Sequence, residues 1–410
     1  MSSKIAETIH EFVRDGIDLQ QGKIETESDP FWKGLRTLGS EPWLDTGDID
    51  AASRLWTSEF SALTTNNTLL NAEVQKGIYD ELIQNSVEIL AGEDLQTQVI
   101  EIAFILNARH GLRLVQRFGG RVSVELHTDL AHDVDRSVEY GRRYYAICPE
   151  NFVIKVPLTP SGLIAMRRLG EDGIPVNFTL GFSARHNHVA TLFGRPAYVN
   201  VFLGRLNSYL LDHKLGDGKY VGEKATLASQ REVRRLTKPE KPTRQIAASL
   251  REAQQVADLA GVDVLTMPVK VADEARQKLS GNWKNCVDND YDVQLNAGVS
   301  ADEIRLHTLW DVSEAERRFT ESLIADVPET AEAVVSRAHD LGVGDLFPRL
   351  SEADLARIAD DGKIPQHAFW ADRIKAGEVG IDTLLNLAGL ASFTSDQTAL
   401  DERIRRLIRK

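Results

Sequence analysis

Short apolar runs alternate with helix-patterned segments over the first 270 residues of the chain. The runs are rich in Val, Ile, Leu and Phe, as is typical of strands that are buried on both faces. They cover residues 41–47, 60–66, 122–127, 152–158, 175–182, 198–204, 244–250 and 262–268. Eight strands alternating with helices predict a parallel (β/α)8 barrel. A doubly wound open sheet is the alternative, but no G-x-G-x-x-G segment follows any of the runs.

Helical sequence also precedes, interrupts and follows the predicted strands. Residues 69–118 are long enough for two or three helices between the second and third strands. Four apolar residues near the N-terminus are spaced for one face of a helix: Ile5, Ile9, Phe12 and Val13. Beyond about residue 300 the strand pattern is absent, and residues 300–327 are expected to form one long helix. The chain therefore divides into a barrel with an N-terminal helix (residues 1–325) and a helical C-terminal extension (residues 326–410).

The charge of the chain narrows the choice of partners. Forty-eight Lys and Arg against 61 Asp and Glu give a formal net charge of −13, which argues against nucleic acid or an anionic membrane as the main partner. Cys148 and Cys286 lie far apart and form neither a disulfide framework nor a zinc-ligand pattern, so a reducing cytoplasm is expected. The N-terminus lacks the apolar core of a signal peptide, and no apolar run of about 18 residues occurs. A homo-oligomer is compatible with these features.

One lysine stands inside an apolar run, in the segment "NFVIKVPLT" (151–159). The run lacks the alternation of a strand with one wet face, so Lys155 is expected to be buried. Burial favours the neutral amine over the ammonium ion. The ordinary explanation is a lysine that snorkels to the surface or forms a salt bridge. The alternative is a nucleophile that forms a Schiff base with a carbonyl substrate.

Polar residues occur in, or at the end of, seven of the eight predicted strands. They are Asp45, Asn66, Glu125, Lys155, Asn177, Thr179, Asn200, Ser249 and Arg251. One polar residue in a buried strand is usually a locally satisfied hydrogen-bonding group. A set that recurs around a barrel is better explained by a shared site, because the C-terminal ends of all the strands meet at one mouth.

Two further motifs receive ordinary interpretations. The string His186-Asn187-His188 is similar to a nuclease motif, but three letters in an acidic chain are weak evidence, and polar surface residues after the fifth strand are expected instead. The segment "DNDYDVQLNAGV" has the spacing of a calcium loop. Val293 and Val299 replace the glycine and the bidentate glutamate that such a loop requires, so no calcium site is expected there.

The motifs around the polar residues resemble those of the transaldolase family, over roughly residues 40 to 270. "WLDTGDID" resembles the family's first strand, with Asp45 as its catalytic aspartate, and "ALTTNNTLL" resembles the second-strand T-T-N-P-[ST] motif, with Asn66 as its asparagine. "VSVELH" carries the third-strand glutamate as Glu125. "FVIKVPLTPSGLIAMRRL" is close to the family's lysine signature and is the most specific stretch, with Lys155 as the Schiff-base lysine.

The remaining motifs cover the last strands of the predicted barrel. "VNFTLGFS" resembles the fifth-strand N-x-T-L-x-F-S pattern, "VNVFLGRLNSY" the sixth-strand S-P-F-V-G-R segment, and "AASLREAQQ" the seventh-strand S-[FL]-R element. Two positions depart from the family: Asn67 and Asn200 stand where it has proline and serine. The last 85 or so residues match no motif of the family.

The resemblance implies a class I transaldolase that works without a metal or organic cofactor. Such an enzyme moves a dihydroxyacetone unit between sugar phosphates of the pentose phosphate pathway, from sedoheptulose 7-phosphate or fructose 6-phosphate to glyceraldehyde 3-phosphate or erythrose 4-phosphate. Lys155 would form the imine, Asp45 would act as general base, and Glu125 and Thr179 would hold the catalytic water. The resemblance assigns substrate binding to Asn66, Asn177, Asn200, Phe202 and Ser183, and phosphate binding to Arg205, Ser249 and Arg251.

Two alternatives accompany this hypothesis. A fructose-6-phosphate aldolase of the same superfamily would release free dihydroxyacetone instead of transferring it. That branch has glutamine and tyrosine where this chain has Glu125 and Phe202, which favours the transferase. The other alternative is an inactive barrel that binds sugar phosphates or acts as a scaffold, and the presence of Lys155, Asp45 and Glu125 together argues against it.

Overall fold

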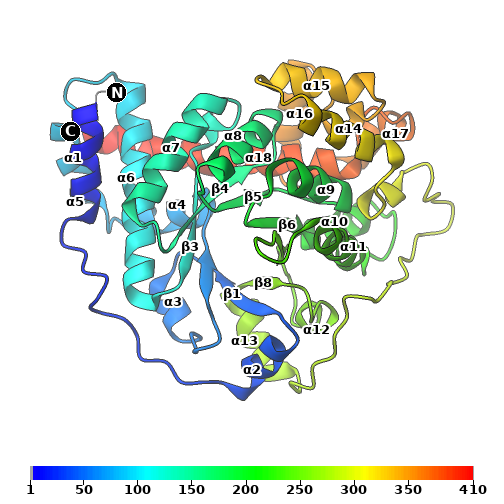
Figure 1. Cartoon of the computed structure of the whole chain (residues 1–410), viewed down its shortest axis with the longest axis horizontal. Coiled ribbons are helices and arrows are strands. Elements are labelled where there is room, and N and C mark those ends of the chain that lie inside the picture. The colour runs from blue at the N-terminus through cyan, green and yellow to red at the C-terminus, as the bar shows by residue number, and fades with distance from the viewer. Residues whose placement is uncertain (1–2, 410) are drawn as a thin grey trace.

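The computed structural model describes residues 3–409 of the chain. Eight parallel strands form a closed barrel in sequential order, and Figure 1 shows helices packed around it. They are β1 (Glu41–Asp45), β2 (Ala62–Thr64), β3 (Arg121–Glu125), β4 (Phe152–Pro157), β5 (Val176–Thr179), β6 (Tyr198–Phe202), β7 (Arg244–Ala248) and β8 (Val264–Pro268). The predicted (β/α)8 barrel is confirmed, and every strand overlaps the apolar run assigned to it. Burial on both faces accounts for these runs, because nearly all of the strand residues are inaccessible to water.

Helices surround the barrel on all sides. Two helices precede the first strand: α1 (Ser3–Arg14) and α2 (Pro30–Thr37). Those between or after the strands are α3 (Ile49–Ser53), α4 (Asn67–Gln75), α5 (Asp80–Ile89), α6 (Leu95–Phe118), η1 (Thr128–Leu130), α7 (Val134–Ile147), α8 (Pro160–Glu171), α9 (Ala184–Gly194), α10 (Leu203–Asp212), α11 (Val221–Leu236), α12 (Gln254–Asp258) and α13 (Val269–Lys278). The three helices α4 to α6 fill the long segment between β2 and β3, as predicted. Helix α1 buries Ile9 and Val13 fully, which confirms the apolar face expected from their spacing.

A group of C-terminal helices packs on the barrel. They are η2 (Leu306–Leu309), α14 (Glu314–Ala325), α15 (Ala331–Asp340), η3 (Gly344–Leu346), α16 (Glu352–Asp361), α17 (His367–Lys375) and α18 (Ile381–Ile408). In Figure 1, α18 extends from the group α14–α17 across the barrel to α4, α5 and α6, against which it packs. One continuous cluster of buried apolar side chains includes both barrel helices and α18. No helix within residues 3–409 is long and apolar enough to cross a membrane.

The prediction of one long helix over residues 300–327 is wrong for the first half of that segment. The structure has turns and η2 there, and α14 begins only at Glu314. Arg305 adopts the left-handed conformation (φ 49°), which an L-residue in a continuing helix does not adopt. Ser313 then starts a new helix, because its side chain and that of Glu316 form a reciprocal capping box.

The surface location expected for the His186-Asn187-His188 string is also wrong. All three residues lie in the first turns of α9 and are at most 2% exposed. Asn187 donates hydrogen bonds to the Asn200 carbonyl (3.0 Å) and the Ser229 hydroxyl (2.8 Å), and His188 Nδ1 lies 2.6 Å from a Glu232 carboxylate oxygen. Long-range polar contacts therefore hold these side chains in the interior, although Asn187 Oδ1 and the Nε2 atoms of His186 and His188 have no hydrogen-bond partner among the described residues.

The neighbouring Arg185 forms a buried ionic cluster with the C-terminal helices. Its guanidinium contacts carboxylate oxygens of Asp382 in α18 (2.7 Å), Asp345 in η3 (2.7 Å) and Glu316 in α14 (3.1 Å). Burial alone would raise the pKa of the Asp382 carboxyl, but the attraction of Arg185 holds it well below its ordinary value. The cluster thus ties α9 of the barrel to three elements that follow it by more than 120 residues.

We expect Asp382→Asn to lower the free energy of unfolding by about 3–5 kcal/mol at pH 7, because it removes one partner of a buried ion pair. The matched control is Asp135→Asn, since Asp135 is 90% exposed and pairs with Arg168 at the surface. That change should cost at most about 1 kcal/mol. Denaturant unfolding measures both effects, and equal losses would show that the cluster contributes no more than a surface pair.

The stability difference between the wild-type protein and Asp382→Asn should depend on pH. The pKa of Asp382 is lower in the folded protein than in the unfolded chain. Its contribution to stability is therefore complete above the unfolded value of about 4 and is lost as the pH falls toward the folded value. The gap between the wild-type protein and Asp382→Asn should accordingly narrow below about pH 4. A gap that stays constant down to pH 3 would contradict this assignment.

Candidate active site

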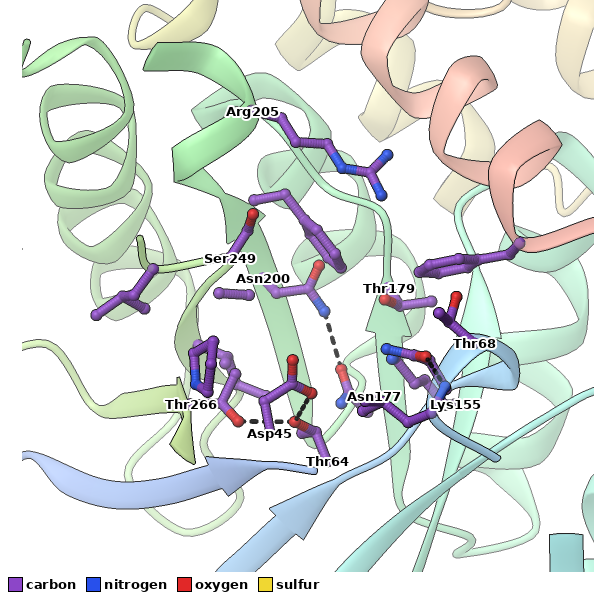
Figure 2. Close-up of a pocket in the computed structure, with 18 of the residues that line it drawn as sticks. Asp45, Thr64, Thr68, Lys155, Asn177, Thr179, Asn200, Arg205, Ser249 and Thr266 are labelled. Atoms are coloured by element: carbon purple, nitrogen blue, oxygen red, sulfur yellow. Dashed lines mark hydrogen bonds between the residues drawn. The ribbon is translucent and has the colours of Figure 1, made fainter. Parts of the chain in front are cut away.

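A cavity of about 290 Å³ opens at the C-terminal mouth of the barrel. Ten of the twelve residues that the sequence nominated line it: Asp45, Asn66, Lys155, Asn177, Thr179, Asn200, Phe202, Arg205, Ser249 and Arg251. They come from six strands, the loops that follow them and the start of α10. Figure 2 shows several of these side chains, among them Asp45, Lys155 and Arg205, around one space. The two that do not line the cavity are Glu125 and Ser183.

The register of three neighbouring strands aligns the central residues. Glu125 of β3 pairs with Lys155 of β4, and Lys155 pairs with Asn177 of β5. Residues paired in this way in a parallel sheet point to the same face, which here is the inside of the barrel. A carboxylate, an amine and an amide therefore lie side by side although 52 positions of sequence separate the first from the last.

The Lys155 amine is buried but only loosely paired. The residue is 4% exposed, and its Nζ donates a hydrogen bond to the Thr65 carbonyl at 3.0 Å. The nearest carboxylate oxygen belongs to Glu125 and lies 4.0 Å away, at the outer limit of a salt bridge. The ring of Phe393, from α18, has its centre 5.7 Å from Nζ. This lysine neither snorkels to the surface nor forms a tight ion pair, so its amine can reach a ligand in the cavity.

Two carboxyl groups flank the amine. Burial raises the pKa of the Asp45 carboxyl, and the nearby Lys155 and a 2.7 Å hydrogen bond from the Thr64 hydroxyl oppose that shift only in part. The Thr64 hydroxyl is also 2.7 Å from that of Thr266, as Figure 2 shows. Burial likewise raises the pKa of Glu125. Raised pKa values suit carboxyl groups that exchange protons near neutral pH.

The backbone of Asn67 holds Glu125 in place. Its N–H donates a hydrogen bond of 3.2 Å to Glu125 Oε2. Asn67 is the first residue of α4, and Asn66 caps that helix by accepting a bond from the Leu69 N–H at 2.9 Å. The position that departs from the family's proline therefore supplies a donor that proline would lack. This bond favours the ionised form of Glu125 and so opposes the rise in its pKa.

A chain of amides fixes the polar groups on β5 and β6. Asn200 Nδ2 donates to Asn177 Oδ1 at 3.0 Å, and Asn177 Nδ2 donates to the Ser123 hydroxyl at 3.2 Å (Figure 2 shows the first bond). Asn200 Oδ1 accepts a bond from the Gly181 N–H at 3.2 Å. Asparagine in place of the family's serine thus reaches across to the neighbouring strand and orients its amide.

Two nominated hydroxyl groups have different surroundings. Thr179 Oγ1 is buried and has no hydrogen-bond partner within residues 3–409, so it can bind a ligand or a water molecule. Ser183 lies outside the cavity, is fully buried and caps α9 by accepting a bond from the His186 N–H. Its hydroxyl also bonds to Asp382. The geometry gives no support to a role for Ser183 in binding substrate.

Two arginines form the cationic end of the cavity. Burial, together with the neighbouring Arg251, lowers the pKa of Arg205 to about 10. No carboxylate of residues 3–409 forms a salt bridge with either guanidinium, and Arg205 Nη1 is buried without an acceptor. Cations that share a site and lack acidic partners are suited to binding an anion such as phosphate.

A glycine brings the two arginines together. A Cβ atom at Gly204 would lie 2.2 Å from the Ser249 carbonyl oxygen and 2.7 Å from Arg251 Cγ. Only glycine therefore allows the start of α10, which carries Arg205, to approach the loop after β7. Ser249 itself has φ 62°, a conformation that costs energy for a non-glycine residue and is often found at ligand sites.

Five polar or aromatic residues that line the cavity were not predicted from the sequence. Thr64 and Thr266 lie in strands, and Thr68 lies in α4, where its hydroxyl bonds to Asp396 of α18. Thr266 could have been predicted, because it is a polar residue inside the eighth apolar run. Lys363 and Phe393 come from the C-terminal extension, which carried no recognisable motif. Among the described residues, no group of three or more His, Cys, Asp or Glu is arranged to hold a metal ion.

Comparison with known proteins agrees with the geometry. A model of the family "Transaldolase/Fructose-6-phosphate aldolase" matches residues 42–318, which is about two thirds of the chain. A transaldolase of Xanthomonas oryzae is 30% identical over 290 residues, covering 65% of this chain and 87% of that protein. A probable transaldolase of Thermus thermophilus is 36% identical over 233 residues, covering 56% of this chain and 86% of that protein. The chain therefore belongs to the transaldolase/fructose-6-phosphate aldolase family of enzymes.

Proposed function

We propose that this enzyme transfers a dihydroxyacetone unit between sugar phosphates through a Schiff base on Lys155. The observation that carries the proposal is the arrangement of one cavity. A buried, loosely paired amine lies there beside two carboxyl groups, and two arginines without acidic partners line the same space. The amine suits a carbonyl, the carboxyl groups suit proton transfer, and the arginines suit a phosphoryl group.

The first step is imine formation. The Lys155 amine attacks carbon 2 of the ketose through its nitrogen electron pair, and the resulting carbinolamine loses water to give a protonated imine. Glu125, 4.0 Å from the amine, and the unpartnered Thr179 hydroxyl hold the water that carries protons to and from this centre. The raised pKa of Glu125 assists, because the carboxyl must both accept and return a proton.

The second step breaks the bond between carbons 3 and 4. Asp45 takes the proton of the hydroxyl on carbon 4, and the electrons of the breaking bond move into the imine, which becomes an enamine. The shortened aldose phosphate leaves with its new aldehyde group. The three-carbon unit remains on Lys155 until an acceptor aldehyde enters, after which the same steps run in reverse.

Other residues bind the two ends of the substrate. Asn66, Asn177 and Asn200 hydrogen-bond the three-carbon unit, and Arg205, Arg251 and Ser249 hold the phosphoryl group. Sedoheptulose 7-phosphate or fructose 6-phosphate would be the donor, with glyceraldehyde 3-phosphate or erythrose 4-phosphate as acceptor, in the pentose phosphate pathway. A cytoplasmic location fits the acidic composition and the two free cysteines.

An aldolase that releases free dihydroxyacetone is the second candidate. Release requires a proton donor for the enamine, which a phenol at position 202 would supply. This chain has Phe202 there, and no tyrosine lines the cavity within the described part of the chain. The absence of a phenol favours transfer over release, because the enamine then waits for an aldehyde.

Borohydride trapping tests the nucleophile. Borohydride with fructose 6-phosphate should inactivate the enzyme and leave the added mass on Lys155, because a reduced imine cannot hydrolyse. Lys155→Met should take no label, whereas Lys270→Met, at a lysine that is 84% exposed, should label normally. Asp45→Ala should still trap substrate but lose about 10²–10⁴ in the rate of carbon–carbon cleavage. Labelling of a different lysine would overturn the mechanism.

Acceptor dependence tests transferase against aldolase. Fructose 6-phosphate turnover should require erythrose 4-phosphate, and Phe202→Tyr should raise the release of dihydroxyacetone without an acceptor. A coupled assay, run with and without the acceptor, measures both. If the unmodified enzyme releases dihydroxyacetone as fast as it transfers it, the aldolase assignment replaces the transaldolase assignment.

Removal of the hydrogen bond from the Asn67 N–H tests the role of Glu125. Asn67→Pro removes the N–H donor at a first helical position, where proline is well tolerated and where the extended Asn66 is compatible with it. The pKa of Glu125 should rise, so the acidic limb of the kcat profile should move to higher pH. Asn67→Ala keeps the N–H and serves as the matched control, and its profile should stay in place. Identical profiles for the two variants would exclude a link between this bond and catalysis.

A further inference from the structure

Two cavity-lining residues come from beyond the part of the chain that the family model covers. Phe393 lies in α18, and Lys363 lies in the loop between α16 and α17. Phe393 spans the cavity, because its ring centre is 5.7 Å from Lys155 Nζ and 5.9 Å from Arg205 Cζ. The C-terminal helices therefore form a wall of the active site that reaches from the amine to the cationic end, and Figure 2 shows the α18 ribbon over this side.

The loop that carries Lys363 is held in a defined position. Within it, the Gln366 N–H donates a hydrogen bond of 2.9 Å to Asp361, and Pro365 is buried. At its end, His367 Nδ1 lies 2.9 Å from the hydroxyl of Tyr209. Tyr209 follows Arg205 by four residues in α10, so the two share a helix face. The loop is thus attached to the face of α10 that presents Arg205.

Lys363 has no acidic partner. Its side chain is exposed, and it forms no ion pair or hydrogen bond with any residue between 3 and 409. The nearest carboxylate in sequence, Asp361, is already engaged by Arg357 at 3.2 Å and by Gln366. Lys363 joins Arg205 and Arg251, so that three basic side chains besides Lys155 line this one cavity in a chain of net charge −13.

We propose that Lys363 is a specificity-determining residue that binds the phosphoryl group of the substrate from the open side of the cavity. This proposal rests on the proposed function and deepens it. The buried arginines offer fixed, planar donors, whereas lysine is a compact charge on a flexible stem. Lys363 can therefore meet an incoming phosphoryl group at the entrance, and the attraction should weaken as salt increases.

The test compares acceptors with and without a phosphoryl group. With fructose 6-phosphate saturating, kcat/KM for the acceptor reports its capture by the three-carbon adduct. Lys363→Ala should lower this value about five- to tenfold for glyceraldehyde 3-phosphate, which corresponds to about 1 kcal/mol, and less than about twofold for glyceraldehyde. Lys363→Arg should keep most of the preference. The inhibition constant of inorganic phosphate should rise in Lys363→Ala by a factor similar to that for the phosphorylated acceptor.

The matched control is Lys375→Ala, which removes the same charge from α17 at a lysine paired with Glu303 outside the cavity. It should leave both acceptors unchanged. Equal losses on both acceptors in Lys363→Ala, or the same result as in Lys375→Ala, would overturn the proposal. Calorimetric titration with inorganic phosphate tests the role of Lys363 separately from the proposed function, because phosphate binding needs no turnover. An enzyme that traps no imine yet binds phosphate through Lys363 would refute the Schiff-base mechanism alone.

Discussion

The common register of β3, β4 and β5 is the constraint on which the active site depends. It places Glu125, Lys155 and Asn177 at one level inside the barrel, so that an amine buried from water finds a carboxylate and an amide beside it. A slip of one residue in β4 would turn Lys155 outward and bring an apolar neighbour into the cavity. The chemistry of the amine therefore follows from strand geometry before any loop contributes.

The second requirement is closure of the mouth, and residues far along the chain supply it. Asn386 of α18 donates hydrogen bonds to the carbonyls of Leu158 and Leu180, at the ends of β4 and β5, at 3.0 and 2.9 Å. His127, after β3, lies 3.3 Å from Asp401 of the same helix. One helix thus fixes the ends of three neighbouring strands while the ring of Phe393 lies over the Lys155 amine, which reduces the access of water to that amine.

The sequence revealed most of the barrel and of its site for one physical reason. Strands buried on both faces must be almost wholly apolar, so Lys155 and Glu125 stood out, and the resemblance to a known family added Arg205 and Phe202. Threonines such as Thr64 and Thr266 did not stand out, because β-branched residues are ordinary in strands. Lys363, Phe393 and the partners of Arg185 could not be found, because contacts across more than 120 residues leave no local pattern. Long-range pairing also explains why the string His186-Asn187-His188 after β5 lies in the interior and not at the surface.

Arg185 has a consequence for the order in which the chain matures. A ribosome delivers the N-terminal part first, so all eight strands emerge well before Asp345 and Asp382. Until those carboxylates arrive, the guanidinium cannot enter the interior without a large electrostatic cost, and α9 must stay open to water. The interior packing of α9 should therefore follow the synthesis of the segments that carry Asp345 and Asp382, because their carboxylates pair with Arg185.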